Sequence, residues 1–473
     1  MQLFPQVATD FFKYRQAQEK KVDEKQQIQR TEHIRYKTKV QAMSDYLAAC
    51  FAEREPMNKV IIVGGGAAGM LASVIAARNG CEVLLFEKNE KLGKKVYITG
   101  KGRCNVTNNC DPEELLQAVM SNPKFLYSAF YSFTSQDMMH LLEEAGVPLK
   151  TERGNRVFPV SDHSSDIIHG LERLMKKYHV QIRLHCEVLE ILTENGIASG
   201  VKLKDHTVYT SDSVIVATGG LSYPTTGSTG DGYRFATETG HKVTECIPSL
   251  VPLTTREDYI PLMKGLSLRN VELTIKRGKK TVYQDFGEMM FTHFGITGPL
   301  VLSASAKIGK FLQKGEELNA FLDLKPALSH EQLDDRILRE FSAAQNKQFK
   351  NVIGVLFPSS LTPVIIGIGP ISGDKIIHDI SRESRLAFGS LVKAFPFTIT
   401  GLGGFSEAVI TRGGVSVKDI QPGSMESKLI KNLYFIGEVL DLDAVTGGYN
   451  LQIAWSTAYL AATDVCRNKE EDI

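Results

Sequence analysis

The pattern of apolar and polar positions changes abruptly after the first 56 residues. Residues 1–56 are rich in Gln, Lys, Arg and Glu and carry no sustained apolar stripe, which predicts a charged helical extension. The chain then reads as a β-branched apolar run at Val60–Val63, a helix of small residues at Ala67–Asn79, and a second apolar run at Glu82–Phe86. This order predicts a right-handed strand–helix–strand unit. We interpret the extension as a surface arm rather than as an oligomerisation or partner helix.

The middle of the chain shows three further patterns. Ser165–Tyr178 is spaced as an amphipathic helix, and the alternation that follows predicts a small antiparallel meander leading to a buried strand at Val214–Ala217. Residues 250–325 suggest strands broken by Gly and Pro, without strand–helix alternation, whereas residues 329–395 read as helices bounded by prolines. Strand signals return at about residue 397.

These patterns predict an α/β nucleotide-binding domain that is interrupted by an inserted substrate domain. A chain of 473 residues is long for one hydrophobic core, which also favours more than one domain. The boundaries that we predict are 1–56 for the extension, 57–246 for the first part of the nucleotide-binding domain, 247–396 for the insert (β-rich over 247–328, helical over 329–396), and 397–473 for the second part.

Composition narrows the class of protein only slightly. The chain is 42% hydrophobic and 23% charged with a net charge of +1, so charge offers no reason to expect nucleic acid or an anionic membrane as a partner. The seven cysteines are scattered without a CxxC pair, which fits neither a zinc site nor a disulfide framework and favours a reducing compartment. The first residues lack an apolar signal region. We therefore expect a cytoplasmic protein with no metal site and no membrane partner, and leave the oligomeric state open.

A glycine-rich turn joins the first strand to the first helix. The letters GGGAAG place Gly64, Gly66 and Gly69 in the G-x-G-x-x-G spacing. The first glycine permits the tight turn, the second lets the backbone approach a pyrophosphate, and the third allows close helix–strand packing. Glu87 closes the second strand 18 residues after Gly69, where an acid can bind the ribose hydroxyls of an adenosine. Together these features predict a dinucleotide site rather than a structural glycine turn.

Further segments favour FAD as the dinucleotide. The long polar loop Lys91–Asn109 follows the ribose-binding acid and could reach along an extended cofactor. The letters SVIVATGG end a buried strand at Ala217–Gly220, and LYFIGEVLD ends a late strand at Gly437–Glu438, where backbone N–H and carboxylate could bind ribityl or phosphate oxygens. The letters TGGYNLQIAWSTA begin a helix at Gly447–Gly448, whose amides could stabilise negative charge on a reduced flavin.

The chain from Lys59 onward resembles the HI0933-like family of flavoproteins. The motifs that carry the resemblance are VIIVGGGAAG, TGKGRCNVTN, GSTGDGY, FTHFGITGP, MESKLIKNLYFIGEVLD and TGGYNLQIAWS. The resemblance implies a Rossmann-like FAD fold of the two-dinucleotide-binding type with an inserted β-rich subdomain and a helical one. It also implies an FAD- and NAD(P)-dependent or aminoacetone-oxidase-like oxidoreductase. One branch of the family reduces conjugated double bonds in 3-oxo bile acids.

Motifs and resemblance together predict the cofactor site. In the loop, the backbone with Lys101 or Arg103 would meet phosphate and ribityl oxygens, and Cys104–Asn105 would lie near the isoalloxazine ring. The full set of predicted FAD-binding residues is Gly64, Gly66, Ala67, Ala68, Gly69, Glu87, Lys88, Gly100, Lys101, Arg103, Cys104, Asn105, Val188, Ala217, Thr218, Gly219, Gly437, Glu438, Gly447, Gly448 and Asn450.

The candidates for acid–base catalysis are Tyr449 and His293. Tyr449 begins the helix beneath the expected flavin, and His293 lies in a Gly- and Pro-rich turn of the insert, where its pKa suits proton donation. A purely structural role is as well supported for each. A redox dithiol of Cys104 and Cys110 is disfavoured, because their spacing differs from that of the flavin disulfide reductases.

The function expected from the sequence is hydride transfer between FAD and a small organic substrate. NAD(P)H, bound transiently in the open cavity, is the expected electron donor, and a conjugated C=C bond is a candidate for the bond reduced. Two alternatives stay open. One is an amine or aminoketone oxidase that passes electrons to oxygen, and the other is a non-catalytic flavin-binding or RNA-modification accessory protein, although no basic stripe supports an RNA partner.

Overall fold

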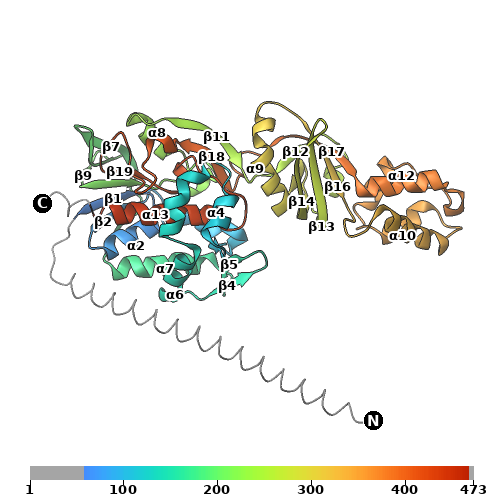
Figure 1. Cartoon of the computed structure of the whole chain (residues 1–473), viewed down its shortest axis with the longest axis horizontal. Helices are drawn as coiled ribbons and strands as arrows, with labels where there is room; N and C mark the ends of the chain where they lie inside the picture. Colours follow the sequence, from blue (N-terminus) through green and yellow to red (C-terminus); the bar gives the residue numbers. More distant parts are fainter. Residues whose placement is uncertain (1–57, 468–473) are drawn as a thin grey trace, which may run out of the picture. The chain divides into compact units, whose positions relative to one another are not determined.

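A parallel sheet forms the core of the α/β part of the computed structural model, which describes residues 58–467 (Figure 1). The predicted extension at 1–56 lies outside the described residues. Five strands pair in the order β19-β10-β1-β2-β6, and every pairing between neighbours is parallel. The strands are β1 (Lys59–Val63), β2 (Glu82–Phe86), β6 (Gln181–Arg183), β10 (Ser213–Val216) and β19 (Leu433–Phe435). The predicted Rossmann-like α/β class is confirmed.

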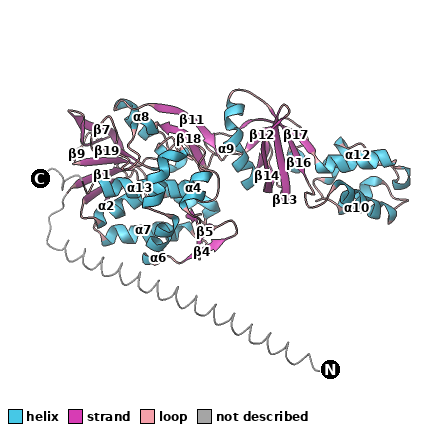
Figure 2. Ribbon diagram, in the orientation of Figure 1, coloured by secondary structure: helices cyan, strands magenta, loops and turns pink. Residues whose placement is uncertain are grey.

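Two helices of small and apolar residues pack against each other beside this sheet (Figure 2). They are α2 (Ala67–Arg78), which follows the glycine turn, and α13 (Tyr449–Asp464), which ends the described chain. Both helices are buried along most of their length. Helix α2 contacts β1 on one side and α13 on the other. A third helix, α7 (Ser164–Lys177), packs on α2 and matches the predicted amphipathic segment. Among residues 58–467, no helix has the length and apolarity that crossing a bilayer requires.

Smaller elements complete the nucleotide-binding domain. Strands β7 (Val188–Glu194), β8 (Ile197–Leu203) and β9 (Val208–Thr210) form the predicted antiparallel meander. The polar loop after β2 contains α3 (Lys94–Ile98) and η1 (Thr99–Gly102). The other elements are β3 (Thr107–Asn108), α4 (Pro112–Ala118), α5 (Tyr127–Ser132), α6 (Ser135–Glu144), β4 (Leu149–Glu152), β5 (Arg156–Pro159), α8 (Asp231–Glu238), η9 (Gly437–Val439) and the antiparallel pair β11 (Val243–Ser249) and β18 (Ile410–Val415).

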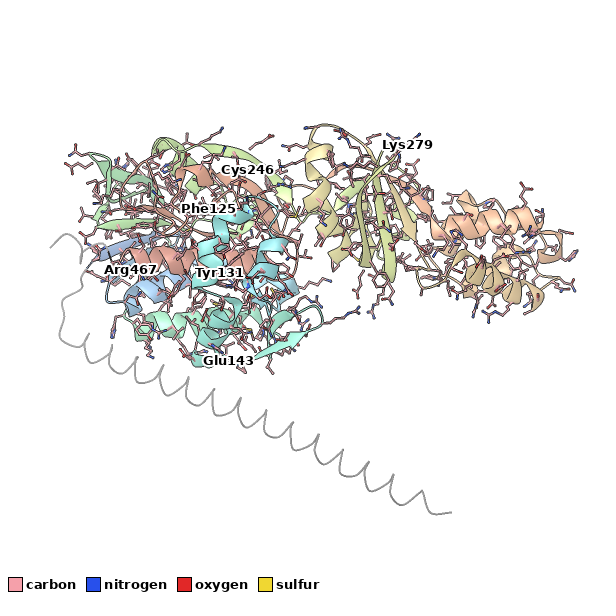
Figure 3. All side chains as sticks on the ribbon, viewed as in Figure 1. Phe125, Tyr131, Glu143, Cys246, Lys279 and Arg467 are labelled. Atoms are coloured by element: carbon pink, nitrogen blue, oxygen red, sulfur yellow. A yellow bond between two sulfur atoms is a disulfide. The ribbon has the colours of Figure 1, made fainter. Side chains whose placement is uncertain are left out.

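The β-rich part of the insert is a closed barrel with the strand order β12-β15-β14-β13-β16-β17. Its strands are β12 (Leu253–Thr255), β13 (Ser267–Arg277), β14 (Lys280–Phe291), β15 (Gly295–Thr297), β16 (Leu318–Asp323) and β17 (Phe395–Leu402). Lys279 marks the tight turn between β13 and β14 (Figure 3). Since β17 pairs with β12 and β16, the boundary predicted at residue 396 falls inside a barrel strand.

The sequence predicts strands without intervening helices over residues 250–325, and this prediction is wrong at one element. Helix α9 (Pro299–Gln313) lies between β15 and β16 and packs on β14 and β17. The Gly298–Pro299 pair that reads as a strand breaker is the start of this helix, because proline fits the first helical position, where its missing N–H costs nothing. Helices α10 (His330–Ser342), α11 (Thr362–Ile368) and α12 (Arg382–Lys393) form the predicted helical part and share one hydrophobic core with the barrel.

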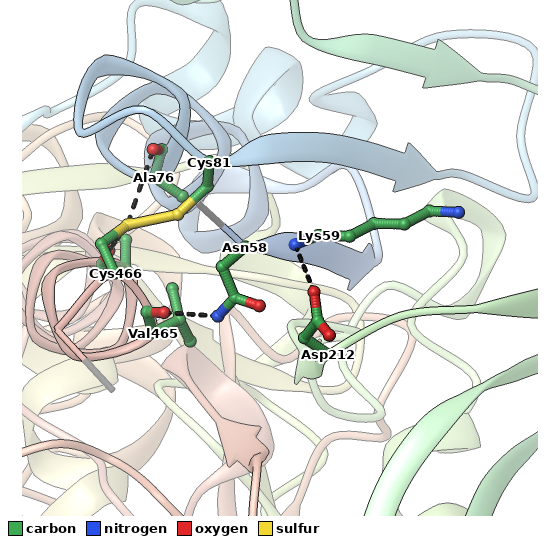
Figure 4. The surroundings of a disulfide bond; sticks show 8 residues. Asn58, Lys59, Ala76, Cys81, Asp212, Val465 and Cys466 are labelled. Atoms are coloured by element: carbon green, nitrogen blue, oxygen red, sulfur yellow. Dashed lines mark hydrogen bonds between the residues drawn. A yellow bond between two sulfur atoms is a disulfide. The ribbon is translucent and has the colours of Figure 1, made fainter. Parts of the chain in front are cut away.

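A disulfide joins Cys81 and Cys466, which are 385 residues apart in the sequence (Figure 4). Cys81 immediately precedes β2, and Cys466 follows α13. Beside the disulfide, the Asn58 side-chain amide donates to the Val465 carbonyl oxygen at 2.6 Å. The cysteine spacing predicted no disulfide framework and did not indicate this single pair, because only the packing of α13 on α2 brings the two residues together.

Candidate functional site

The candidate site is a cleft at the carboxyl ends of the parallel strands. It encloses about 1310 Å³ with its open mouth included. Residues that directly follow β1, β2, β10 and β19 lie in its wall, as expected for ligand sites of open α/β sheets. The lining residues are Val63–Ala68, Phe86–Asn89, Gly93–Val96, Thr99, Cys186–Val188, Ala217–Gly219, Thr226–Ser228, Asp231, Phe235, Val409, Ile410, Ile436, Glu438, Leu442, Asn450, Leu451, Ile453 and Ala454.

The three glycines of the turn are required for different reasons. Gly64 has φ +108°, and a Cβ there would lie 2.5 Å from the Ala217 carbonyl oxygen. A Cβ at Gly69 would overlap the Gly64 carbonyl oxygen, so this glycine lets α2 pack on the turn. At Gly66, by contrast, no atom lies within 4 Å of an added Cβ. The protein itself gives no steric reason for glycine at position 66, and the cleft in front of it is shaped for the close approach of a ligand.

Backbone amides, rather than side-chain cations, are suited to hold an anion in this cleft. Helix α2 begins at Gly66 without a side-chain cap, so its first N–H groups and its positive dipole end face the turn. Three lysines and four acids line the cleft, a formal charge of −1, and the charged lining residues are Lys88, Lys94, Lys95, Glu87, Glu187, Asp231 and Glu438. The pyrophosphate of a dinucleotide would therefore bind at the helix N-terminus.

Glu87 is held in place by its own neighbours. It is buried, and its Oε2 accepts a hydrogen bond from the Gly65 backbone N–H at 2.7 Å. Its Oε1 accepts from the backbone and side-chain N–H groups of Asn89 at 2.8 and 2.6 Å. Three of about four lone pairs are thus used within the protein, which leaves one for a ribose hydroxyl.

A segment from Thr226 to Asp231 covers the end of the cleft that contains Glu87. The Asn89 side chain donates to the Thr226 carbonyl oxygen at 3.1 Å, and Lys88 Nζ lies 2.6 Å from the Asp231 carboxylate. The cofactor residues predicted from the sequence include Lys88 but not Asn89, and the segment with Asp231 was expected to line the cofactor or substrate cavity. The signal in the sequence was the GSTGDGY motif, which contains Asp231.

Lys95 and Glu438 form an ion pair in the cleft wall. Lys95 Nζ lies 2.6 Å from Glu438 Oε2 and 2.9 Å from Oε1, and it also donates to the Ser222 hydroxyl. Glu438 Oε1 accepts further hydrogen bonds from the Ser222 hydroxyl at 2.6 Å and from the Thr411 backbone N–H at 2.9 Å. Lys95 is not among the cofactor residues predicted from the sequence, because its partner lies 343 residues away in the chain.

One residue of the cleft wall carries a buried hydroxyl without a partner among residues 58–467. The hydroxyl of Thr218, which follows β10, is shielded from solvent and makes no hydrogen bond with the described residues. An added Cβ at Gly232 would lie 2.3 Å from this hydroxyl, so the group faces α8 and not the open cleft. The open cradle at Gly66 and the acid at Glu87 fit a dinucleotide cofactor.

Twelve of the predicted cofactor residues line the cleft. These are Gly64, Gly66, Ala67, Ala68, Glu87, Lys88, Val188, Ala217, Thr218, Gly219, Glu438 and Asn450. The other nine do not line it, and they are Gly69, Gly100, Lys101, Arg103, Cys104, Asn105, Gly437, Gly447 and Gly448. The cofactor roles of both groups remain predictions.

The loop with the letters TGKGRCN is held by protein contacts. Arg103 pairs with Glu152 and with Asp162 at 2.6 Å, and its guanidinium lies 4.2 Å from the centre of the Phe158 ring. Cys104 is fully buried, and burial raises its pKa to about 11. Arg103 and Cys104 therefore each have a structural role in the protein, whether or not they contact a ligand.

Two predicted cofactor glycines near the C-terminal end of the chain, Gly437 and Gly448, have packing roles. A Cβ at Gly448 would overlap the backbone of Thr107 in β3, and a Cβ at Gly437 would lie 2.9 Å from the Ala68 side chain in α2. The Gly437 backbone N–H, predicted to bind the cofactor, donates instead to the Thr457 hydroxyl at 3.0 Å. Glycine at these positions lets η9 and α13 approach the core closely.

Neither candidate proton donor lines the cleft. Tyr449 is half-buried, and burial, followed by the nearby Cys110 and Glu114, raises its pKa. His293 is exposed in the turn between β14 and β15, where its ring packs edge-on against Phe294. Their catalytic roles stay predictions. The thiols of Cys104 and Cys110 are free, and burial, with Glu114 and Asp111 nearby, raises the pKa of Cys110 to about 12, which opposes a redox role at neutral pH.

The chain matches a protein family model and is similar to known proteins in sequence and in structure. A family model described as "HI0933-like protein Rossmann domain" matches residues 58–464. The chain is 29% identical over 410 residues to the 3-dehydro-bile acid delta(4,6)-reductase of Clostridium scindens, covering 86% of this chain and 98% of that protein. It is 32% identical over 412 residues to a protein of Haemophilus influenzae named ribosomal RNA dihydrouridine synthase, with the same coverage. The structure of 3-ketosteroid-delta4-(5alpha)-dehydrogenase from Rhodococcus jostii RHA1 is similar with a TM-score of 0.49 and 15% identity, covering 87% of this chain and 97% of that chain.

Proposed function

Because the chain belongs to the HI0933-like family and is an FAD-dependent oxidoreductase, we propose that it reduces a C=C bond conjugated with a carbonyl group, with NAD(P)H as electron donor. The alternative of a non-catalytic flavin-binding protein therefore does not apply. The observation that supports the proposed bond type most directly is the similarity to the bile-acid reductase, which extends over 98% of that protein.

The cleft residues would bind and orient the cofactor. Bound FAD supplies a hydride donor and acceptor. The N–H groups at the start of α2 would hold the pyrophosphate, and Glu87 would hold the adenosine ribose through its remaining lone pair. The side chains of Leu442, Leu451 and Ile453 line the cleft with apolar surface, which would keep water from the reacting atoms.

A uracil ring is a second candidate substrate. Its C=C bond is also conjugated with a carbonyl group, and relatives at 31% and 32% identity carry the name ribosomal RNA dihydrouridine synthase. The same hydride chemistry would serve both substrates. The near-neutral charge of the chain favours the small organic substrate.

Anaerobic stopped-flow experiments test the proposal in two steps. The first step compares NADH and NADPH as reductants of the FAD-loaded enzyme. The second mixes the reduced enzyme with a 3-oxo-4-ene steroid, a uridine-containing RNA or oxygen, and a parallel assay adds a panel of amines to the oxidised enzyme.

We expect NAD(P)H to bleach the flavin and the steroid to restore its absorption. Rapid bleaching by an amine, with reoxidation by oxygen alone, would support the oxidase alternative and overturn the proposal. Reoxidation by RNA and not by the steroid would retain the proposed bond type and assign the uracil ring as substrate.

A further inference from the structure

We propose that residues Thr226–Asp231 form a clasp over the adenosine end of the cleft, where Glu87 lies. Lys88 and Asn89 hold the clasp closed, and it opens for FAD to enter or leave. This role rests on the FAD binding proposed above, and it concerns the rate of cofactor exchange rather than the reaction itself. It gives the GSTGDGY motif a function in cofactor retention.

Side chains from one wall of the cleft fasten the clasp on the other wall. Lys88 and Asn89 lie just after β2, and they line the same cleft as the clasp. Lys88 Nζ donates to the Thr229 hydroxyl at 2.5 Å and lies 2.6 Å from the Asp231 carboxylate. The Asn89 side chain donates to the Thr226 carbonyl oxygen at 3.1 Å. These three contacts join segments that are 137 to 143 residues apart in the chain.

The contacts of Lys88 lie on the solvent side of the clasp. Thr229 is exposed, and the side chains of Lys88 and Asp231 each retain 24% of their exposure. The neighbouring Ser228, by contrast, is buried and lines the cleft. The clasp therefore lies between the adenosine end of the cleft and the solvent.

Two glycines allow the clasp to move as a unit. Gly227 has φ +104° and Gly230 has φ +86°, and glycine enters this left-handed region at no steric cost. Loops that gate binding sites commonly turn about a few such residues, which absorb the change in backbone angles. Between the two glycines, the Thr229 backbone N–H donates to the Gly227 carbonyl oxygen at 3.0 Å, and opening need not break this internal bond.

Asn89 connects the clasp to the acid that would bind the ribose. Its side-chain N–H groups reach Glu87 Oε1 at 2.6 Å and the Thr226 carbonyl oxygen, and its side-chain oxygen accepts from Lys94 Nζ at 3.3 Å. An added Cβ at Gly227 would overlap the Asn89 amide nitrogen, so glycine is also required for this close approach. Closure of the clasp thus completes the hydrogen bonds of the residue that positions Glu87.

Two substitutions of Thr229 test the clasp, because they change its charge at an exposed side chain outside the cleft lining. The clasp carries a charge of −1, from Asp231. Thr229→Glu doubles this charge and strengthens the attraction to Lys88, whereas Thr229→Lys cancels it. Forces within the clasp are the same whether it is open or closed, so the contact with Lys88 decides the outcome. We expect Thr229→Glu to slow FAD release from the holoenzyme about 2- to 5-fold and Thr229→Lys to speed it by a similar factor.

Two rates are measured for each variant. Release of FAD into an excess of 5-deaza-FAD, followed by flavin fluorescence, gives the dissociation rate, and mixing FAD with the full-length apoprotein gives the association rate. A clasp changes both rates in the same direction and leaves Kd nearly unchanged. Long-range attraction of the anionic cofactor predicts the opposite for release, because the added lysine would slow it and the added glutamate would speed it. That result would overturn the proposal, and so would release rates equal to those of the wild type.

Two controls show whether the effect passes through Lys88. In the Lys88→Met background, Thr229→Glu should no longer slow release, and slowing that persists would overturn the proposal. Thr225→Lys is the matched control, because Thr225 is exposed and lies outside both the clasp and the cleft lining. Its release rate should equal that of the wild type, and equally fast release from this control would show a general charge effect instead of a clasp. A wild-type apoprotein that binds no FAD would overturn the proposed function itself.

Discussion

Gly66 and Gly69 lie three residues apart in one turn but are glycines for different physical reasons. An added Cβ at Gly66 meets only the cleft, whereas one at Gly69 meets the Gly64 carbonyl oxygen. Gly66 also has an extended backbone, with φ −80° and ψ −167°, that any residue can adopt. Substitution at Gly66 should therefore affect the ligand, and substitution at Gly69 should affect the fold.

We predict that Gly66→Val weakens FAD binding by about 100-fold or more, since the side chain would occupy the path of the pyrophosphate. The free energy of unfolding of the apoprotein should change by less than about 0.5 kcal/mol. Gly69→Ala, the paired comparison, should lower that free energy by about 1–3 kcal/mol because of overpacking. Urea unfolding and FAD titration measure the two effects, and equal destabilisation by both substitutions would contradict the distinction.

Glu87 combines a structural role with a binding role. We predict that Glu87→Ala weakens FAD binding and also lowers the stability of the apoprotein by about 1–3 kcal/mol, because the Gly65 N–H loses its acceptor. Glu87→Gln retains an oxygen for Gly65 and should restore most of the stability while FAD binding stays weakened. A Glu87→Gln variant with full FAD affinity would show that the negative charge is not needed for ribose binding.

At the scale of elements, the contact between α13 and β3 decides how the end of the chain meets the cofactor domain. Gly448 precedes α13 with φ +99°, and its backbone touches that of Thr107. The single tryptophan of the chain, Trp455, lies fully buried in α13 and donates to the Val106 carbonyl oxygen at 2.9 Å. Its fluorescence therefore reports directly on the packing of this helix.

We predict that Gly448→Ala destabilises the protein by about 2–4 kcal/mol, from backbone strain and overlap with Thr107. The tryptophan emission should shift to longer wavelength at lower urea concentration than in the wild type. Gly423→Ala is the control, because that glycine is exposed and an added Cβ meets no atom within 4 Å. Equal unfolding midpoints for the two variants would contradict the packing role of Gly448.

At the scale of the whole molecule, the Cys81–Cys466 disulfide links the first strand–helix–strand unit to the last helix. We predict that Cys466→Ser lowers the free energy of unfolding by about 2–5 kcal/mol, because the bond closes a very long loop in the unfolded chain. Cys246→Ser, at a free and partly buried cysteine, should have a much smaller effect. Thiol titration of the denatured protein should gain two groups on reduction, and an unchanged thiol count would show that the bond does not form.

The sequence by itself determined the parts of this protein that are encoded over short distances. The β1–α2–β2 unit, the glycine turn and Glu87 all lie between residues 59 and 87, where strand and helix periodicity and the glycine spacing act locally. The helix predicted at Ser165–Tyr178 lies within one residue of α7 for the same reason. The family motifs then indicated the cofactor and the class of reaction.

Only the tertiary structure decided which distant residues meet. Lys95 and Glu438 are 343 residues apart, Cys81 and Cys466 are 385 apart, and Gly448 contacts Thr107 from the far end of the chain. Arg103, which does not line the cleft, likewise pairs with Glu152 at the end of β4 and with Asp162 after β5. No local pattern predicts such contacts, because each depends on how helices and loops pack around the completed sheet.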